Sequence, residues 1–217
     1  MQTSNASAFQ RLRAVVHVSN MDILHAASME TCKRVSASPY FTALREKTLS
    51  VQGYYQMLNH LSIFYDALDQ AINGFLEKDK SMNHMKHHLC ASILKDDIKH
   101  LSECLQYEQD SSVAEASAWN TIHIPAITSK AQLLGYLYAY RLPTCEASFL
   151  MYDNAGELLT RSDSLGRRFL AHSERYLHRY ELAIAINDTN DSVTVIDACE
   201  NLLNLIDGHL QALPVRN

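Results

Sequence analysis

The sequence predicts an all-α protein with a single domain. Only 6 glycines and 4 prolines are spread over 217 residues, which favours long helices over turn-rich β structure. Apolar residues recur at spacings of three and four along most of the chain, and no stretch alternates as a half-buried strand does. With 47% hydrophobic and 20% charged residues, the chain is expected to bury one sizeable core.

The helices expected in the first half follow from this spacing and from capping residues. Asn20 is the predicted N-cap of the second helix, and Pro39 suits the first position of the third, after Ser38. Ser50 is expected to start a long helix with one apolar stripe. A polar stretch over residues 77–88 follows it. The predicted helices span residues 9–18, 21–35, 39–47, 50–76 and 89–107.

The second half is predicted to begin with a loop over residues 108–118 and an extended segment around Pro125, followed by three further helices. The first of these contains Pro143, which removes a backbone donor and is expected to bend the helix. Such a kinked helix often borders a cofactor or cavity, although the spacing suits a core helix equally well. Its three tyrosines alternate and are not expected all to face inward; one or two are expected to hydrogen-bond across a cavity. The three helices span residues 133–150, 162–186 and 193–210.

Charge and cysteine content limit the kinds of partner. The formal net charge is -5 and no long basic run occurs, which argues against a nucleic-acid groove or an anionic membrane surface. Five cysteines without a Cys-x-x-Cys pair are typical of reduced thiols in a cytoplasmic protein. No secretory signal or membrane-spanning stretch is expected. Residues 1–20 are interpreted as an N-terminal extension and residues 21–213 as the domain.

The densest group of candidate metal ligands is His84, His87, His88 and Cys90. His84 and His88 are four residues apart and could share a metal on one helix face. No second pair with ligand spacing is near in the sequence, and three lysines add positive charge to the region. The interpretation as surface histidines is therefore favoured.

The order of several short stretches resembles the heme oxygenase family over about residues 24–210. The family's first helix carries Leu-Arg, then Thr, then a His that binds heme iron, and the same frame runs here from Leu24 to Cys32. The other similar stretches are residues 39–41, 49–50, 53–54, 64–69, 94–101, 124–125 and 134–138. The resemblance implies a heme oxygenase-like helical bundle with a kinked helix of the distal type.

The resemblance implies that Cys32 occupies the position of the heme-ligating His. A thiolate can bind heme iron, but it favours cleavage of the O–O bond, unlike the neutral imidazole of the family. Alternatively, Cys32 is a small buried apolar residue, as most free cysteines are. His25 is a second candidate ligand, although it lies two turns away, about 10 Å, in the register of the family's Arg.

The family's distal helix is rich in glycine because the missing Cβ lets the backbone approach the porphyrin. In this sequence the matching stretch starts at Tyr138, and the three glycine positions hold Leu142, Glu146 and Ala147. Pro143 can restore some of the bend but not the space. The predicted cofactor-binding positions are Cys32, His25, Tyr138, Leu142, Pro143, Glu146 and Ala147, with Cys32 as the iron ligand if heme binds.

Two functions from different classes remain. The missing His and the filled glycine positions favour a divergent member that has lost heme cleavage and acts as a ligand-binding or regulatory protein for a tetrapyrrole or another hydrophobic molecule. The alternative is an active heme oxygenase that cleaves heme to biliverdin, carbon monoxide and iron, with Cys32 as an altered axial ligand and electrons from a reductase.

A third interpretation is a non-heme di-iron oxidase of similar fold. It requires carboxylates and histidines at three- or four-residue spacing on several helices. The chain offers two such pairs and two further acids, but a solvated, salt-bridged surface explains them more simply. The residues concerned are Asp97 with His100, Glu174 with His178, and Asp66 or Asp69.

Overall fold

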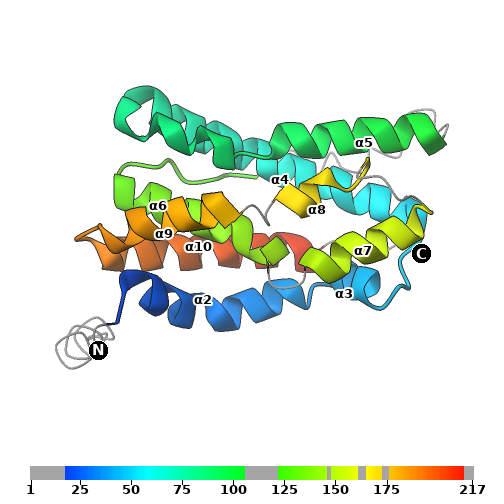
Figure 1. The fold of residues 1–217 in the computed structure, drawn as a ribbon, viewed down its shortest axis with the longest axis horizontal. Helices are drawn as coiled ribbons and strands as arrows, with labels where there is room; N and C mark the ends of the chain where they lie inside the picture. The colour runs from blue at the N-terminus through cyan, green and yellow to red at the C-terminus, as the bar shows by residue number, and fades with distance from the viewer. Residues whose placement is uncertain (1–17, 106–121, 146–147, 161–164, 173–175, 213–217) are drawn as a thin grey trace.

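The computed structural model describes residues 18–105, 122–145, 148–160, 165–172 and 176–212, all of it helix and connecting segments without a strand in these ranges (Figure 1). The all-α class is therefore confirmed. The helices are α2 (Asn20–Ser36), α3 (Pro39–Arg45), α4 (Val51–Lys78), the 3-10 helix η1 (Lys80–His88), α5 (Ala91–Leu105), α6 (Lys130–Cys145), α7 (Ser148–Leu158), α8 (Arg168–His172), α9 (Tyr176–Asn187) and α10 (Ser192–Gln211).

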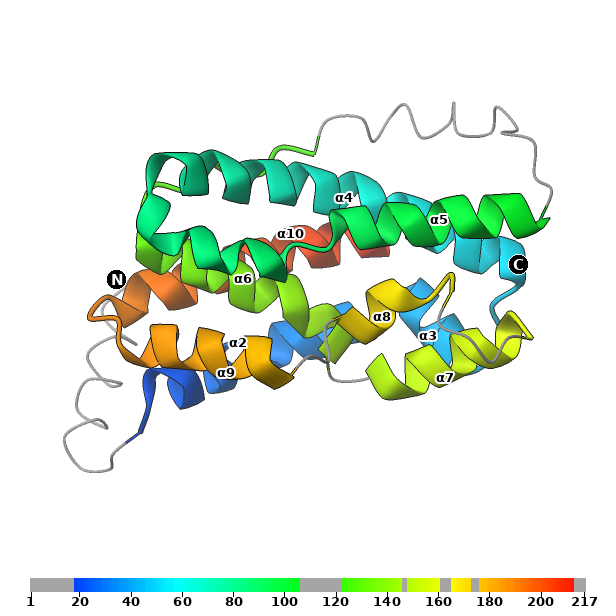
Figure 2. The same ribbon diagram turned by 45° about the horizontal axis from the view of Figure 1, so that its top comes forward.

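The helices stack in layers around α6. Figures 1 and 2 show α4 and α5 on one side, α6 with α10 in the middle, and α2 with α3 on the other side. The crossing of α6 and α10 is close because position 135 is glycine: a Cβ there would lie 2.8 Å from the Ala198 Cβ and closer still to the Val195 carbonyl oxygen. No helix in the described ranges is both long enough and apolar enough to cross a membrane.

The N-terminus of α2 differs from the expectation. Ser19, not Asn20, is the N-cap, and it forms a capping box with Asp22 in which each side chain binds the backbone N–H of the other residue. Asn20 is buried, and its Nδ2 donates to the carbonyl oxygens of Ile186, Asn187 and Thr189 at 2.9–3.2 Å. The side chain therefore joins the start of α2 to the end of α9.

The long helix α4 agrees with the expectation. The Ser50 hydroxyl accepts a hydrogen bond from the backbone N–H of Gly53 and thereby caps the N-terminus of α4. Every residue of the predicted apolar stripe is buried. Ser38 holds the N-cap position of α3, but its side chain makes no capping bond there. The stretch after α4 forms η1, where no helix was expected. The buried stripe is Tyr54, Leu58, Leu61, Phe64, Tyr65, Leu68 and Ile72.

The prediction of a single buried stripe on the kinked helix was wrong. The structure describes the predicted helix as α6, up to Cys145, and α7, from Ser148, and residues 146–147 lie outside the described residues. Instead of one buried stripe, α6 is buried on all sides from residue 133 to residue 141, because neighbouring helices cover every face. All three tyrosines are buried, at 2–5% exposure: Tyr136, Tyr138 and Tyr140.

Two other expectations concern segments that the structure describes only in part. The helix expected over residues 162–186 is two helices, α8 and α9. The helix expected over residues 9–18 and the loop over residues 108–118 lie outside the described residues, apart from position 18.

Candidate functional site

The two residues of α2 that were predicted to bind a cofactor, His25 and Cys32, lie two turns apart on the helix and differ in burial. Cys32 is 1% exposed on the core side. Its thiol is close enough to that of Cys199, on α10, to contribute to a raised pKa of Cys199, which is caused mainly by burial. Cys32 is therefore packed toward α10.

His25 is exposed, near the start of α2, and its side chain reaches α6. Its Nδ1 is 3.2 Å from the hydroxyl oxygen of Tyr138, which is itself buried. The structure thus brings two of the predicted site residues into direct contact, as a bridge between α2 and α6.

The structure describes little of the other four predicted cofactor-binding positions, which are Pro143 and the three residues at the family's glycine positions. Leu142 and Pro143 belong to α6, but their side chains lie outside the described residues, as do Glu146 and Ala147 entirely. The prediction that these side chains fill the space beside a porphyrin therefore stays a prediction.

A porphyrin held between α2 and α6 needs room for two van der Waals contacts, about 7 Å between the facing side chains. At the level of His25 and Tyr138 those side chains touch each other, and farther along α2 the Cys32 thiol is enclosed. The α2–α6 pair is therefore closed at this one level, and the positions that would lie beside a porphyrin, residues 142–147, have side chains outside the described residues.

Sequence reasoning missed a hydrogen-bond network behind α6. The Tyr140 hydroxyl donates to Asp69 Oδ1 at 2.7 Å and accepts from the backbone N–H of Cys90 at 2.7 Å. Asp69 Oδ2 accepts from the backbone N–H of Ala91 at 3.1 Å. Together these side chains satisfy the first N–H groups of α5. Burial raises the pKa of Asp69 from 3.8 to about 6.

The acids proposed for a di-iron site have other contacts. Asp97 is buried and accepts from the backbone N–H of Phe169 at 2.7 Å at the start of α8, and Asp66 lies 2.8 Å from the Lys95 ammonium. The side chains of Glu174 and His178 lie outside the described residues. In the ranges that the structure describes, none of these acids belongs to a group of three metal-ligating side chains.

One group of three ligating side chains does form in those ranges: His87 and His88 on η1 with Glu181 on α9. His84 also lies near Glu181, whereas the Cys90 backbone is engaged by Tyr140 and burial raises the pKa of its thiol. The predicted histidine cluster thus gains a carboxylate from a distant segment and loses its cysteine. No local signal could have revealed Glu181, which follows His88 by more than 90 residues.

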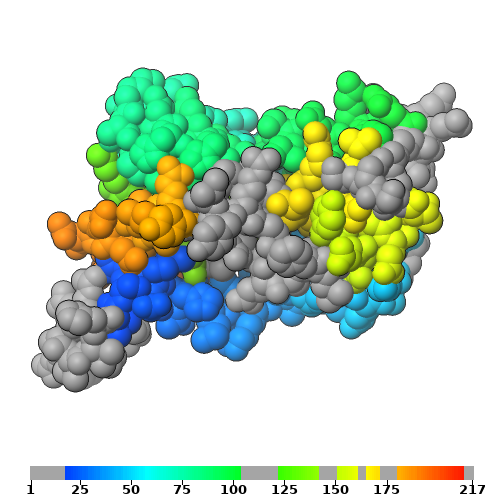
Figure 3. Space-filling view, viewed as in Figure 1, coloured from blue at the N-terminus to red at the C-terminus, as the bar shows by residue number. Residues whose placement is uncertain are grey.

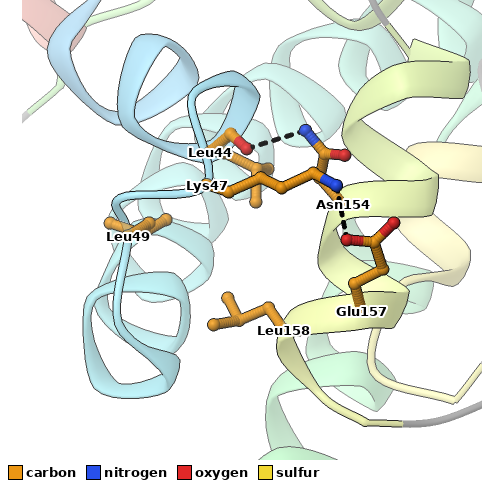
Figure 4. A pocket seen from close by; sticks show the side chains of 6 residues that line it. All are labelled: Leu44, Lys47, Leu49, Asn154, Glu157 and Leu158. Atoms are coloured by element: carbon orange, nitrogen blue, oxygen red, sulfur yellow. Dashed lines mark hydrogen bonds and ion pairs between the residues drawn. The ribbon is translucent and has the colours of Figure 1, made fainter.

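A separate hollow of about 220 Å³ lies between the end of α3 and α7 (Figure 4). Asn154 Nδ2 closes one side by donating to the Leu44 and Arg45 carbonyl oxygens, and the Lys47 ammonium contacts the Glu157 carboxylate at 2.5 Å. This polar rim stabilises the end of α3, and no predicted site residue lines it.

The arrangement of the helices is that of a heme oxygenase-like bundle, as comparison with solved structures shows. No protein-family model and no curated protein sequence matches the chain. Among solved structures, the heme oxygenase of Leptospira interrogans is 15% identical over 90% of this chain and 100% of its own, with a TM-score of 0.63. Heme oxygenase-1 of the cyanobacterium Synechocystis sp. PCC6803, in complex with heme, is 14% identical over 89% of this chain and 91% of its own, with a TM-score of 0.64.

These likenesses confirm the resemblance as a shared fold. The chain has the all-helical heme oxygenase fold over most of its length, at a sequence identity of only 14–15% to the two neighbours. The fold alone does not carry the chemistry with it.

Proposed function

We propose that this protein uses the heme oxygenase fold to bind a ligand or a partner and no longer cleaves heme. The observation that carries the proposal is the burial of Cys32, which is 1% exposed on α2 near Cys199 of α10, because the resemblance places Cys32 at the position of the family's His. Iron ligation requires a thiolate, and burial in apolar surroundings opposes formation of a thiolate.

Two further features support this proposal. The His25–Tyr138 contact holds α2 and α6 together at one level of the bundle. The sequence places Leu142 and Glu146 where the family keeps glycine, which would restrict the approach of a porphyrin. Binding of a smaller hydrophobic ligand, or of a protein partner, does not require glycine at position 142 or 146.

The alternative is an active heme oxygenase that releases biliverdin, carbon monoxide and iron. The shared fold favours it, since one structural neighbour was solved in complex with heme. In this case Cys32 or His25 would serve as the axial ligand, the substrate would be a tetrapyrrole, and a reductase would supply electrons.

Titration of the purified full-length protein with hemin, followed by visible spectroscopy, separates the two functions. We expect no saturable Soret shift, and none in Cys32→His alone, because Leu142 and Glu146 would still fill the positions where the family keeps glycine. Cys199→Ala is the matched control, since it removes the neighbouring thiol on the other helix. Saturable one-to-one binding that Cys32→Ala abolishes and Cys199→Ala retains would overturn the proposal and call for a reductase-coupled turnover assay.

A further inference from the structure

The contact between η1 and α9 gathers three imidazoles around one carboxylate. Glu181 Oε2 lies 2.7 Å from His87 Nε2 and 3.7 Å from His88 Nε2, and Glu181 Oε1 lies 4.0 Å from His84 Nε2. Figure 3 shows the orange surface of α9 meeting the green surface of the upper layer in this region. We propose that His87, His88 and Glu181 bind a divalent transition-metal ion of the zinc type, with His84 beside them as a further ligand.

The spacing of the ligand atoms suits tetrahedral coordination. With metal–ligand bonds of 2.0–2.1 Å, the ligand atoms of a tetrahedral zinc site are about 3.3 Å from one another. The atoms of His87, His88 and Glu181 all lie within 4.8 Å of one another, and the two separations from Glu181 Oε2, 2.7 and 3.7 Å, fall on either side of the tetrahedral value. Small side-chain rotations therefore suffice to close the site.

The exposure of the side chains allows a metal to enter. His88 is fully enclosed and fixes the inner wall, whereas His87 and Glu181 are each about a third exposed, at 37% and 36%. His84 is 51% exposed, so its side chain can rotate toward the ion. The site therefore has a buried anchor and an open outer position that a water molecule can occupy.

The donor atoms select the class of metal. Two or three imidazole nitrogens with one carboxylate suit zinc, cobalt, nickel or copper, whereas magnesium and calcium prefer sites made of oxygen atoms. The ligand set carries only one negative charge, that of the Glu181 carboxylate, because the imidazoles bind as neutral groups. The imidazole nitrogens must therefore supply most of the affinity.

Arg141 opposes binding, in addition to the positive charge of the nearby lysines. Its Nη1 lies 3.5 Å from His88 Nδ1, at the outer limit of hydrogen-bond length, and a guanidinium can only donate. A metal on Nε2 leaves the proton on Nδ1, so the two donors would face each other and this weak contact would be lost.

Metal binding would join two parts of the fold that the chain connects only indirectly. The helix η1 packs on α4, whereas α9 packs on α6 and α2. An ion at this place would hold α9 against the opposite layer of the bundle. This inference concerns a different place from the α2–α6 pair and does not rest on the proposed function.

The test is calorimetric titration of the full-length protein, freed of any affinity tag, with Zn²⁺, and with Mg²⁺ as the contrasting ion. We expect one saturable Zn²⁺ site, no comparable Mg²⁺ site, and a loss of at least about tenfold in affinity in His87→Ala and in Glu181→Gln. His123→Ala is the matched control, because it removes an exposed histidine elsewhere. Zn²⁺ should also raise the melting temperature of the wild type and not that of Glu181→Gln.

The titrations and melting temperatures can contradict the proposed metal site in the following ways. If the wild type shows no saturable Zn²⁺ binding, or if His123→Ala weakens binding as much as His87→Ala does, the site is not the one proposed. Glu181→Gln keeps the shape of the side chain, so a metal-free melting temperature equal to that of the wild type shows that its loss of binding does not come from unfolding.

Discussion

The close crossing of α6 and α10 predicts that Gly135→Ala destabilises the protein. The added Cβ would lie 2.8 Å from the Ala198 Cβ, 3.0 Å from the Cys199 backbone nitrogen, and closer to the Val195 carbonyl oxygen. Two of these three atoms belong to the backbone of α10, so relief requires the whole helix to move. Forcing a methyl group into a packed core costs about 1–3 kcal/mol, and rigid backbone neighbours favour the upper end.

The helix propensity of alanine acts in the opposite direction. Replacing glycine within a helix gains about 1 kcal/mol, so the net loss expected for Gly135→Ala is about 2 kcal/mol. Gly74→Ala, in α4, is the matched control, because nothing lies within 4 Å of the added Cβ. That variant is expected to gain about 1 kcal/mol. The two variants should therefore differ by about 3 kcal/mol.

Urea denaturation followed by circular dichroism measures both variants against the wild type. The linear dependence on urea gives the free energy of unfolding directly, provided that the slopes agree. If Gly135→Ala were as stable as the wild type while Gly74→Ala gained stability, the two helices would not approach as closely as described, and the reasoning would be refuted.

Two other predictions concern buried polar groups. Burial raises the pKa of Asp69 from 3.8 to about 6, so its contribution to stability is present below 3.8 and is lost as the pH rises through 6. Between pH 4 and 7 the wild type should lose up to about 3 kcal/mol relative to Asp69→Asn in urea denaturation, and a difference that does not change with pH would contradict this. Asn20→Ala leaves three carbonyl oxygens at the end of α9 without their donor and should cost about 2 kcal/mol in thermal unfolding. Asn59→Ala, whose amide binds only within its own helix at Tyr55, should cost much less.

The parts of the fold that sequence predicted correctly depend on local signals. The cap at Ser50 and the apolar spacing of α4 lie within one helix, and both are confirmed. The N-cap of α2 was assigned one residue too late because Ser and Asn are both good caps, and only the contacts of Asn20 with α9 distinguish them.

The features that sequence did not predict depend on distant neighbours. Alternating tyrosines on a helix with one exposed side cannot all be buried. However, α6 is enclosed on every side by other helices, and its own sequence does not indicate this. Likewise, the interpretation of the η1 histidines as surface residues is correct for His84 and His87, whereas His88 is buried and their carboxylate partner, Glu181, lies on α9. The position of Cys32 against Cys199 is a third example, since the two lie on α2 and α10.

The pairing of α2 with α10 also affects how the protein is made. The apolar side of α2 is covered mainly by α10. During synthesis α2 therefore leaves the ribosome early, and its main packing partner leaves late. At about 5–20 residues per second, α2 remains without its partner for roughly ten seconds or more during synthesis. Over that interval its apolar side is open to chaperones and to other nascent chains, and the bundle closes only when α10 emerges.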